Sequence, residues 1–204
     1  MKAYRRIGVF LDRDGTINED PSGYIGDPEQ VVLFPGAASA IRKLGELNLR
    51  VMVVTNQAGV ARGCHGEEDV RRTNERMAKL LAREGARVDG FYTCPHHVEG
   101  VVSRYRIVCA CRKPEPGMLL RAASDFGVDP AGSDIVGDAL SDMLAGDRVG
   151  AKKVLVLTGR GRESRTQNEE TQDVQMDYVA RDLSDAVRWI AEDLGKWESE
   201  KVRK

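Results

Sequence analysis

Residues 10–16 read Phe-Leu-Asp-Arg-Asp-Gly-Thr and close a short apolar run that spans 7–11. A run of this length, bounded by polar residues, is typical of a buried strand in a parallel sheet. Asp12 and Asp14 follow it directly, and Gly15 gives the backbone freedom to turn sharply. The segment therefore predicts a strand whose carboxyl end presents two carboxylates.

The rest of the chain repeats this alternation of strand and helix. Strand-like apolar runs occupy 51–54, 91–93, 135–136 and 154–157, and helical periodicity marks 37–47, 67–84, 118–126, 142–148 and 183–194. Such alternation predicts an α/β fold, a single Rossmann-like domain whose parallel sheet has helices on both faces. We expect this domain to span 1–194, with a polar loop over 159–177, no insertion long enough for a large cap domain, and a charged tail over 195–204.

The overall composition excludes several classes of partner. The chain carries 31 basic and 32 acidic residues, so its net charge of −1 recruits neither nucleic acid nor an anionic membrane. No apolar run approaches the length that crosses a bilayer, and the N-terminus lacks a signal-peptide core. We therefore expect a cytoplasmic monomer that acts on a small molecule.

In a parallel sheet the ligand site lies beyond the carboxyl ends of the strands. Candidate chemical residues meet that rule, because each follows a strand or precedes a helix. An acid pair alone is usually a solvated turn, and a lone aspartate before a helix is often a cap. The joint order instead favours a magnesium site, since Mg²⁺ takes hard oxygen ligands, with a hydroxyl and a cation for a phosphoryl group. The set comprises Asp12, Asp14, Thr55, Asn56, Lys113, Asp138 and Asp142.

A second constellation is rich in sulfur and imidazole. Cys94-Pro95-His96-His97 and Cys109-Ala110-Cys111 place four soft ligands in one short segment, which suits a closed, structural zinc site. Spacing alone does not choose between His96 and His97, and a disulfide or unrelated buried cysteines are the alternatives. The remaining pair, Cys64 and His65, lacks further ligands nearby, so we expect a loop there.

Together the acid pair, Thr55, Lys113 and the second acidic cluster resemble the four motifs of the haloacid dehalogenase superfamily. The resemblance implies that Asp12 is a nucleophile that forms an aspartyl-phosphate, and that Asp14 is the general acid and base. It also implies that Mg²⁺ binds the Asp12 carboxylate, the Asp14 carbonyl and Asp138, while Thr55 and Lys113 hold the phosphoryl oxygens. Because a general acid must be protonated, we expect the pKa of Asp14 to be raised.

Within that superfamily, the chain resembles the heptose-bisphosphate phosphatases in three segments. These are the segment of the four soft ligands, 94–111, called the metal loop below; Thr-Asn-Gln-Ala-Gly-Val-Ala-Arg-Gly at 55–63; and Gly-Tyr-Ile at 23–25. This resemblance selects His96 as the zinc ligand and implies removal of the 7-phosphate from a heptose 1,7-bisphosphate. One departure is Ala139, where such enzymes often carry a lysine. The residues implied to contact substrate are Tyr24, Asn56, Gln57, Ala58, Arg62 and Arg112.

Three other functions compete with this one. Histidinol-phosphate phosphatases share the aspartate pair and the metal loop, and a polynucleotide 3′-phosphatase would share the chemistry. A zinc-stabilised nucleic-acid-binding module would not be an enzyme. Near-zero net charge and an aromatic content of 5% weigh against such a module. A salt titration with an oligonucleotide would test the polynucleotide 3′-phosphatase.

Overall fold

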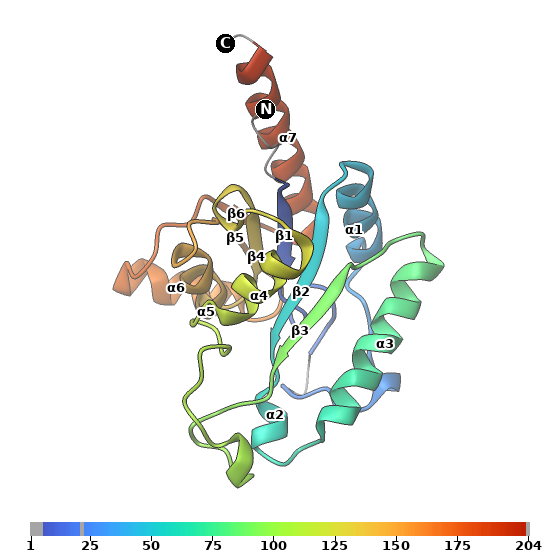
Figure 1. The fold of residues 1–204 in the computed structure, drawn as a ribbon, viewed down its shortest axis with the longest axis vertical. Helices are drawn as coiled ribbons and strands as arrows, with labels where there is room; N and C mark the ends of the chain where they lie inside the picture. Colours follow the sequence, from blue (N-terminus) through green and yellow to red (C-terminus); the bar gives the residue numbers. More distant parts are fainter. Residues whose placement is uncertain (1–5, 21–22, 203–204) are drawn as a thin grey trace.

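The computed structural model describes residues 6–20 and 23–202, with side chains to residue 195. Within this part of the chain, six strands form one parallel sheet in the order β3-β2-β1-β4-β5-β6 (Figure 1). The predicted strands are present, and a short sixth strand, which carries no strong apolar signal, joins the edge. The strands are β1 (Gly8–Leu11), β2 (Arg50–Asn56), β3 (Gly90–Cys94), β4 (Asp134–Gly137), β5 (Lys152–Val156) and β6 (Tyr178–Ala180).

Strand register brings the candidate residues to one edge. Leu11, the last residue of β1, pairs with Val53 of β2 on one side and with Val136 of β4 on the other. The next residue, Asp12, donates its backbone N–H to the carbonyl of Val136 at 2.9 Å. Residues that follow these three strands therefore meet at the same edge.

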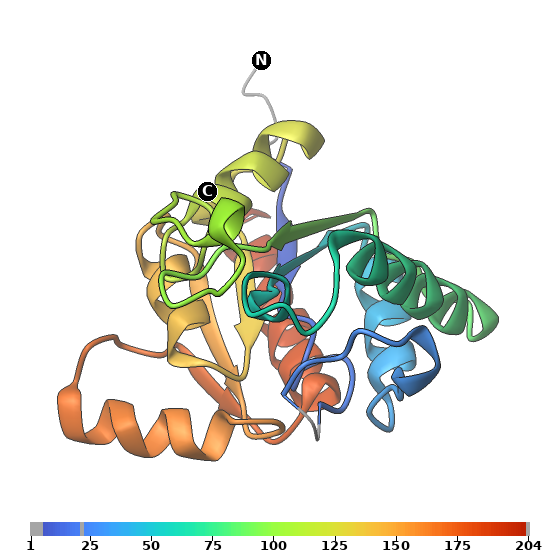
Figure 2. The same ribbon diagram turned by 90° about the horizontal axis from the view of Figure 1, so that it is seen from below.

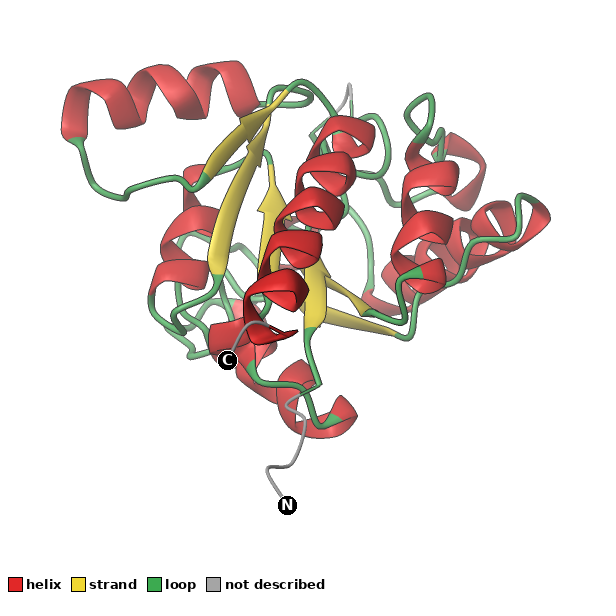
Figure 3. Cartoon of the chain, turned by 90° about the horizontal axis from the view of Figure 1, so that it is seen from above, coloured by secondary structure: helices red, strands yellow, loops and turns green. Residues whose placement is uncertain are grey.

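Helices cover both faces of the sheet, as the sequence predicts (Figures 2 and 3). On one face lie α1 (Ala37–Glu46), α3 (Glu67–Arg83) and α7 (Leu183–Val202); α4 (Gly117–Phe126) and α5 (Leu140–Asp147) lie on the other. The connections between described elements hold only loops and short turns, and none forms a cap domain. Those turns are α2 (Ala58–Ala61), η1 (Pro28–Gln30), η2 (Ser103–Tyr105) and η3 (Pro130–Gly132).

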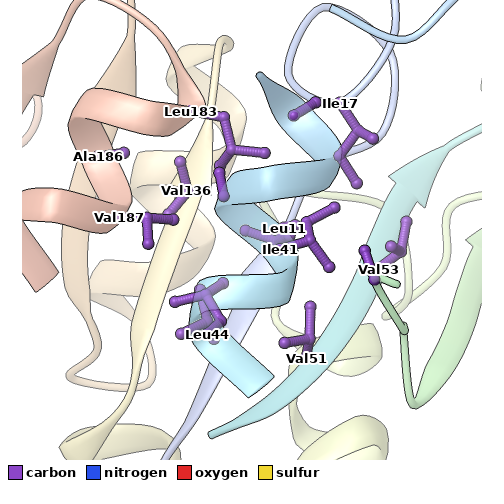
Figure 4. Close-up of a cluster of buried hydrophobic side chains, with 14 of the residues drawn as sticks. Leu11, Ile17, Ile41, Leu44, Val51, Val53, Val136, Leu183, Ala186 and Val187 are labelled. Carbon is purple, nitrogen blue, oxygen red and sulfur yellow. The ribbon is translucent and has the colours of Figure 1, made fainter. Parts of the chain in front are cut away.

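The main core lies between the sheet and helices α1 and α7. Alternate residues of a strand point to opposite faces, so Leu11 faces α1 while Phe10 packs on the α4 side. Burial of each aliphatic side chain contributes about 1.5–3 kcal/mol, which holds the strand ends in register. Figure 4 shows Ile17, Ile41, Leu44, Val51, Val53, Val136, Leu183, Ala186 and Val187 around Leu11.

Two segments differ from the prediction. The loop predicted over 159–177 contains a helix, α6 (Gly161–Thr171), in which only Gly161 and Ser164 are buried. Because α6 has almost no apolar face, hydrophobic periodicity gives no signal for it. Helix α7 continues to Val202, through most of the predicted tail.

Residues 1–5 of the predicted domain and 203–204 of the predicted tail lie outside the described chain. Among the helices that are described, none has both the length and the apolar character needed to cross a membrane.

Candidate active site and metal loop

Lys113 forms the centre of the predicted phosphoryl site. Its side chain is almost fully buried, and its Nζ lies 2.8 Å from Asp12 Oδ1, 2.5 Å from Asp142 Oδ1 and 2.7 Å from the carbonyl oxygen of Val54. Burial lowers the pKa of Lys113, but the two carboxylates outweigh it and the pKa is raised. The ammonium is therefore permanently charged.

Three carboxylates gather around this single cation. Oxygens of Asp12, Asp138 and Asp142 all lie within 4.8 Å of one another, and all three residues are buried. Burial raises the pKa of Asp12 well above its ordinary value, and burial with the neighbouring Asp142 raises that of Asp138 to about 6. One lysine does not balance three carboxylates, so the cluster suits a hard divalent cation that takes oxygen ligands.

A strap after β5, residues 158–160, packs against this cluster. The backbone N–H of Arg160 donates to Asp138 Oδ2 at 2.7 Å, and Thr158 Oγ1 donates to the carbonyl of Gly15 at 2.7 Å. Gly15 has a φ of +82°, and a Cβ there would lie 2.1 Å from Asp138 Oδ2, so only glycine fits. The sequence predicts a polar loop from residue 159 and gives the strap no role at the site. The available signal was Thr-Gly-Arg-Gly at 158–161, directly after a predicted strand.

Asp14 accepts four hydrogen bonds. Arg13 Nε donates to Oδ1 at 2.9 Å and Arg13 Nη2 to Oδ2 at 2.7 Å, while Asn18 Nδ2 and Gln57 Nε2 donate to the two oxygens at 2.9 and 2.8 Å. Burial raises the pKa of this carboxyl, but the charge of Arg13 and the four hydrogen bonds lower it by more. The net shift of the pKa is therefore downward. The expectation of a raised pKa is wrong for this arrangement, because the sequence did not show that Arg13 turns back onto its neighbour.

The residues after β2 use their side chains inside the site. Asn56 accepts from the backbone N–H of Lys113 and donates to its carbonyl, both at 3.0 Å, so it clamps the lysine backbone. Gln57 also donates to Thr55 Oγ1 at 2.9 Å. Thr55 and Ala58 are buried beside them. The amides of Asn56 and Gln57, predicted to line a substrate pocket, are thus engaged with protein groups.

The four predicted zinc ligands converge in the metal loop. The Sγ of Cys111 lies 3.1 Å from that of Cys94 and 3.3 Å from that of Cys109, and His96 Nδ1 lies 3.3 Å from Cys111 Sγ. In a tetrahedral zinc site with Zn–S bonds of about 2.3 Å, sulfurs stand about 3.8 Å apart, so the cysteine sulfurs here are somewhat closer together than in a zinc-bound site. His97 Nδ1 instead accepts the N–H of Glu99 at 3.1 Å, so the donor set that fits zinc includes His96.

Cys64 is exposed and lies outside this group, and no described cysteine is in a disulfide. His65 packs against Gly26 and Gly59, where an added Cβ would lie 2.6 Å from the His65 Cβ and 2.3 Å from its ring Cε1, respectively. The two residues lie in the loop that the sequence predicts, beside a pocket of about 400 Å³ that Tyr24 also lines.

The metal loop leads directly to Arg112, whose Nη1 donates to the carbonyl of His96 at 3.1 Å. Burial lowers the pKa of Arg112. The Cys94 and Cys109 sulfurs and the Tyr24 phenol raise it, but the net shift is downward. Arg62 lies on the surface, where it pairs with Glu99 at 3.4 Å.

Comparison with known proteins agrees with this geometry. A HAD-hydrolase-like family model matches residues 110–186. The D-glycero-β-D-manno-heptose-1,7-bisphosphate 7-phosphatase of Rhodopseudomonas palustris is 45% identical over 148 residues, which are 72% of this chain and 82% of that protein. Its counterpart in Escherichia coli is 42% identical over 179 residues, 87% of this chain and 90% of that one.

Among solved structures, the D,D-heptose 1,7-bisphosphate phosphatase from B. bronchiseptica, complexed with magnesium and phosphate, has a TM-score of 0.80 at 32% identity. The match covers 92% of this chain and 99% of that structure. Sequence and structure similarity agree along nearly the whole length. The chain belongs to the family of HAD-type phosphatases that contains the D-glycero-β-D-manno-heptose-1,7-bisphosphate 7-phosphatases.

Proposed function

We propose that this chain hydrolyses the 7-phosphate of D-glycero-β-D-manno-heptose 1,7-bisphosphate with Mg²⁺ as cofactor. The observation that carries the proposal is the buried cluster in which Lys113 contacts Asp12 and Asp142 beside Asp138. A nucleophilic carboxylate, a fixed cation and an excess of oxygen ligands are the parts that phosphoryl transfer requires. The named relatives act on this sugar bisphosphate.

Asp12 is the residue that attacks. One of its carboxylate oxygens forms a bond to phosphorus as the bond from phosphorus to the sugar oxygen breaks, which gives an aspartyl-phosphate. Water then displaces the aspartate and releases phosphate, so that one difficult displacement becomes two easier ones. Lys113, already 2.8 Å from Asp12, offsets charge on the phosphoryl oxygens throughout.

Asp14 moves the protons. It donates one to the departing sugar oxygen in the first step and removes one from water in the second. Before substrate binds, Arg13 and the amides hold this carboxyl ionised. A phosphate dianion placed beside it adds like charge, which raises the pKa of Asp14 and favours the protonated form that the first step needs.

Two metals fit the donor sets. Asp12, Asp138 and the Asp14 carbonyl would hold Mg²⁺, which supplies positive charge against the repulsion between nucleophile and phosphate. Cys94, His96, Cys109 and Cys111 would hold Zn²⁺ with all four positions filled by protein, hence in a structural role. The hydrogen bond from Arg112 to the His96 carbonyl supports a role for the metal loop in fixing this cation, which in our proposal faces the substrate.

Substrate choice rests on Arg112. The side chain of Lys113 is committed to the reacting phosphoryl group, whereas the guanidinium of Arg112 offers a fork for a second anion. Histidinol phosphate has no such anion. The lysine that relatives often carry is Ala139 here, so Arg112 is the group expected to read the second phosphate.

The test compares kcat/KM for heptose 1,7-bisphosphate, fructose 1,6-bisphosphate and histidinol phosphate. We expect the heptose bisphosphate to be the best substrate, and Arg112→Ala to reduce its hydrolysis by about 10- to 100-fold, more than that of a sugar monophosphate. Arg104→Ala is a matched control, because Arg104 is a cation of the same loop that stacks on Tyr105. Equal losses in Arg112→Ala on the heptose bisphosphate and on the sugar monophosphate, or a preference of the wild-type protein for histidinol phosphate, would reject the assignment.

A further inference from the structure

Arg13 lies between the two predicted catalytic aspartates. Its side chain is completely buried and is the largest of the fully buried side chains among the described residues. A guanidinium is costly to remove from water unless its donors are satisfied and its charge is balanced. Asp14 balances the charge and accepts two parallel hydrogen bonds from Arg13, of 2.9 and 2.7 Å. Such bidentate pairing fixes the plane of the carboxylate as well as its position.

The other end of Arg13 is held by a helix outside the recognised motifs. Arg13 Nη1 donates to Asn74 Oδ1 at 2.9 Å, and Asn74 is itself 8% exposed. Asn74 lies on α3, which Met77 and Leu81 anchor in the main core. The guanidinium therefore links the loop that carries it to the helix layer that covers the sheet.

Gln57 and Asn18 complete the arrangement from the other sides. Each Asp14 oxygen receives one hydrogen bond from Arg13 and one from an amide. With two donors on each oxygen, the carboxylate has little freedom to rotate. Its direction is set mainly by Arg13, the one charged donor.

We propose that Arg13 and Asn74 are positioning residues that orient Asp14 for proton transfer to the leaving group. This inference rests on the proposed function, in which the proton leaves Asp14 Oδ for the sugar oxygen as the phosphorus–oxygen bond breaks and the bond to Asp12 forms. Effective general acids must lie within hydrogen-bond reach of the atom that they protonate. Misorientation therefore lowers kcat/KM, which reports the steps up to the aspartyl-phosphate, only where the leaving oxygen needs a proton. The later transfer of a proton from water is common to all substrates and enters kcat alone.

Leaving-group dependence tests this inference. A sugar alkoxide cannot leave without a proton, whereas p-nitrophenolate and the acetate of acetyl phosphate can. For Asn74→Leu and Arg13→Lys, we expect kcat/KM for the sugar phosphate to fall by about 10- to 100-fold. For the two activated substrates the fall should stay within about threefold, since general acid catalysis contributes little to them.

Thr73→Val is the matched control, because Thr73 is a buried neighbour on α3 that bonds Asp69 and does not touch Arg13. Thermal melting checks that each variant folds, and Asn74→Leu carries the test if Arg13→Lys does not. Equal losses on all substrates, or no loss on the sugar phosphate, would overturn the inference. Asp14→Asn should reproduce the selective loss in kcat/KM. If Asp12→Asn stays active, the proposed function fails instead.

Discussion

Asp12, the proposed nucleophile, is under two opposing influences on its charge. It is buried, which raises its pKa and disfavours its charge, yet Lys113 contacts it directly. Asp138 and Asp142 add further negative charge to the same small volume. Contact with Lys113 favours the ionised carboxylate against the effect of burial. An ionised carboxylate at this buried position is poorly solvated and therefore reactive.

Asp12→Asn removes the nucleophile and one of these charges. We expect phosphate release to fall by at least about 10³-fold, because an amide cannot form the aspartyl-phosphate. The fold should survive, since Lys113 keeps Asp142 as its partner and a neutral group replaces a carboxylate in a crowded acidic cluster. Phosphate release, with circular dichroism and melting as checks on folding, measures both effects; activity above a few per cent of wild type would contradict the role of Asp12.

At the scale of elements, the metal loop joins two distant parts of the catalytic edge. Cys94 ends β3, while Cys109 and Cys111 directly precede the two basic residues at the site. Tyr105 in η2 hydrogen-bonds Glu67 at the start of α3, so the loop is also tied to a helix. Loss of the metal should therefore loosen the segment that ends in Arg112 and Lys113.

Replacing Cys109 and Cys111 together with serine tests this coupling. Elemental analysis of wild-type protein should find about one zinc per chain, and the double variant should bind none, since a four-ligand site needs its thiolates. We expect the melting temperature to fall by about 5 °C or more, because structural zinc contributes folding free energy.

KM should rise with this loss of stability, as Arg112 loses the fixed carbonyl of His96. Cys64→Ser is the control, because Cys64 is exposed and lies away from the ligand group, and it should change neither zinc content nor melting. Unchanged melting in the double variant would show that the site does not stabilise the loop.

At the scale of the whole molecule, the two ends of the sheet have different roles. The carboxyl ends of β1, β2 and β4 carry the chemistry, and the opposite ends serve packing. Asp134, the first residue of β4, is a buried carboxyl at that opposite end, and burial raises its pKa to about 7, with Asp193 and Asp177 adding to the shift against Lys152. It has no part in the proposed reaction, and burial makes its ionised form costly to the stability of the fold.

The sign of its effect follows from the raised pKa. Between about pH 4 and 7 the unfolded chain releases this proton while the folded chain keeps it, so stability falls as pH rises through that window. Asp134→Asn, a neutral mimic, should raise the free energy of unfolding by on the order of 1–3 kcal/mol at pH 8 and leave it unchanged near pH 4.

Urea unfolding from pH 4 to 8.5 measures this difference. Asp173→Asn, the same charge change at an exposed position, is the matched control. A variant that is less stable than wild type at pH 8 would mean that ionised Asp134 stabilises the fold through Lys152.

Much of this architecture could be predicted from local sequence. Short apolar runs that end in Asp12, Thr55 and Asp138 predicted both the strands and the edge where they meet, because parallel strands carry their functional residues at their carboxyl ends. The metal loop could be predicted because its four ligands lie close together in the sequence, within the 18 residues 94–111. Helix α6 escaped prediction because a surface helix with no apolar face leaves no periodic signal.

What only the tertiary structure decided is the direction of side chains whose partners lie far away in the chain. Arg13 turns onto Asp14 because Asn74, 61 residues later, holds its far end, and the strap at 158–160 reaches Gly15 from 143 residues away. These contacts reverse the expected pKa shift of Asp14 and engage the amides of Asn56 and Gln57. Residue order determined which groups reach the site, whereas packing between layers determined where each group points, since rotamers depend on neighbours that the local sequence does not specify.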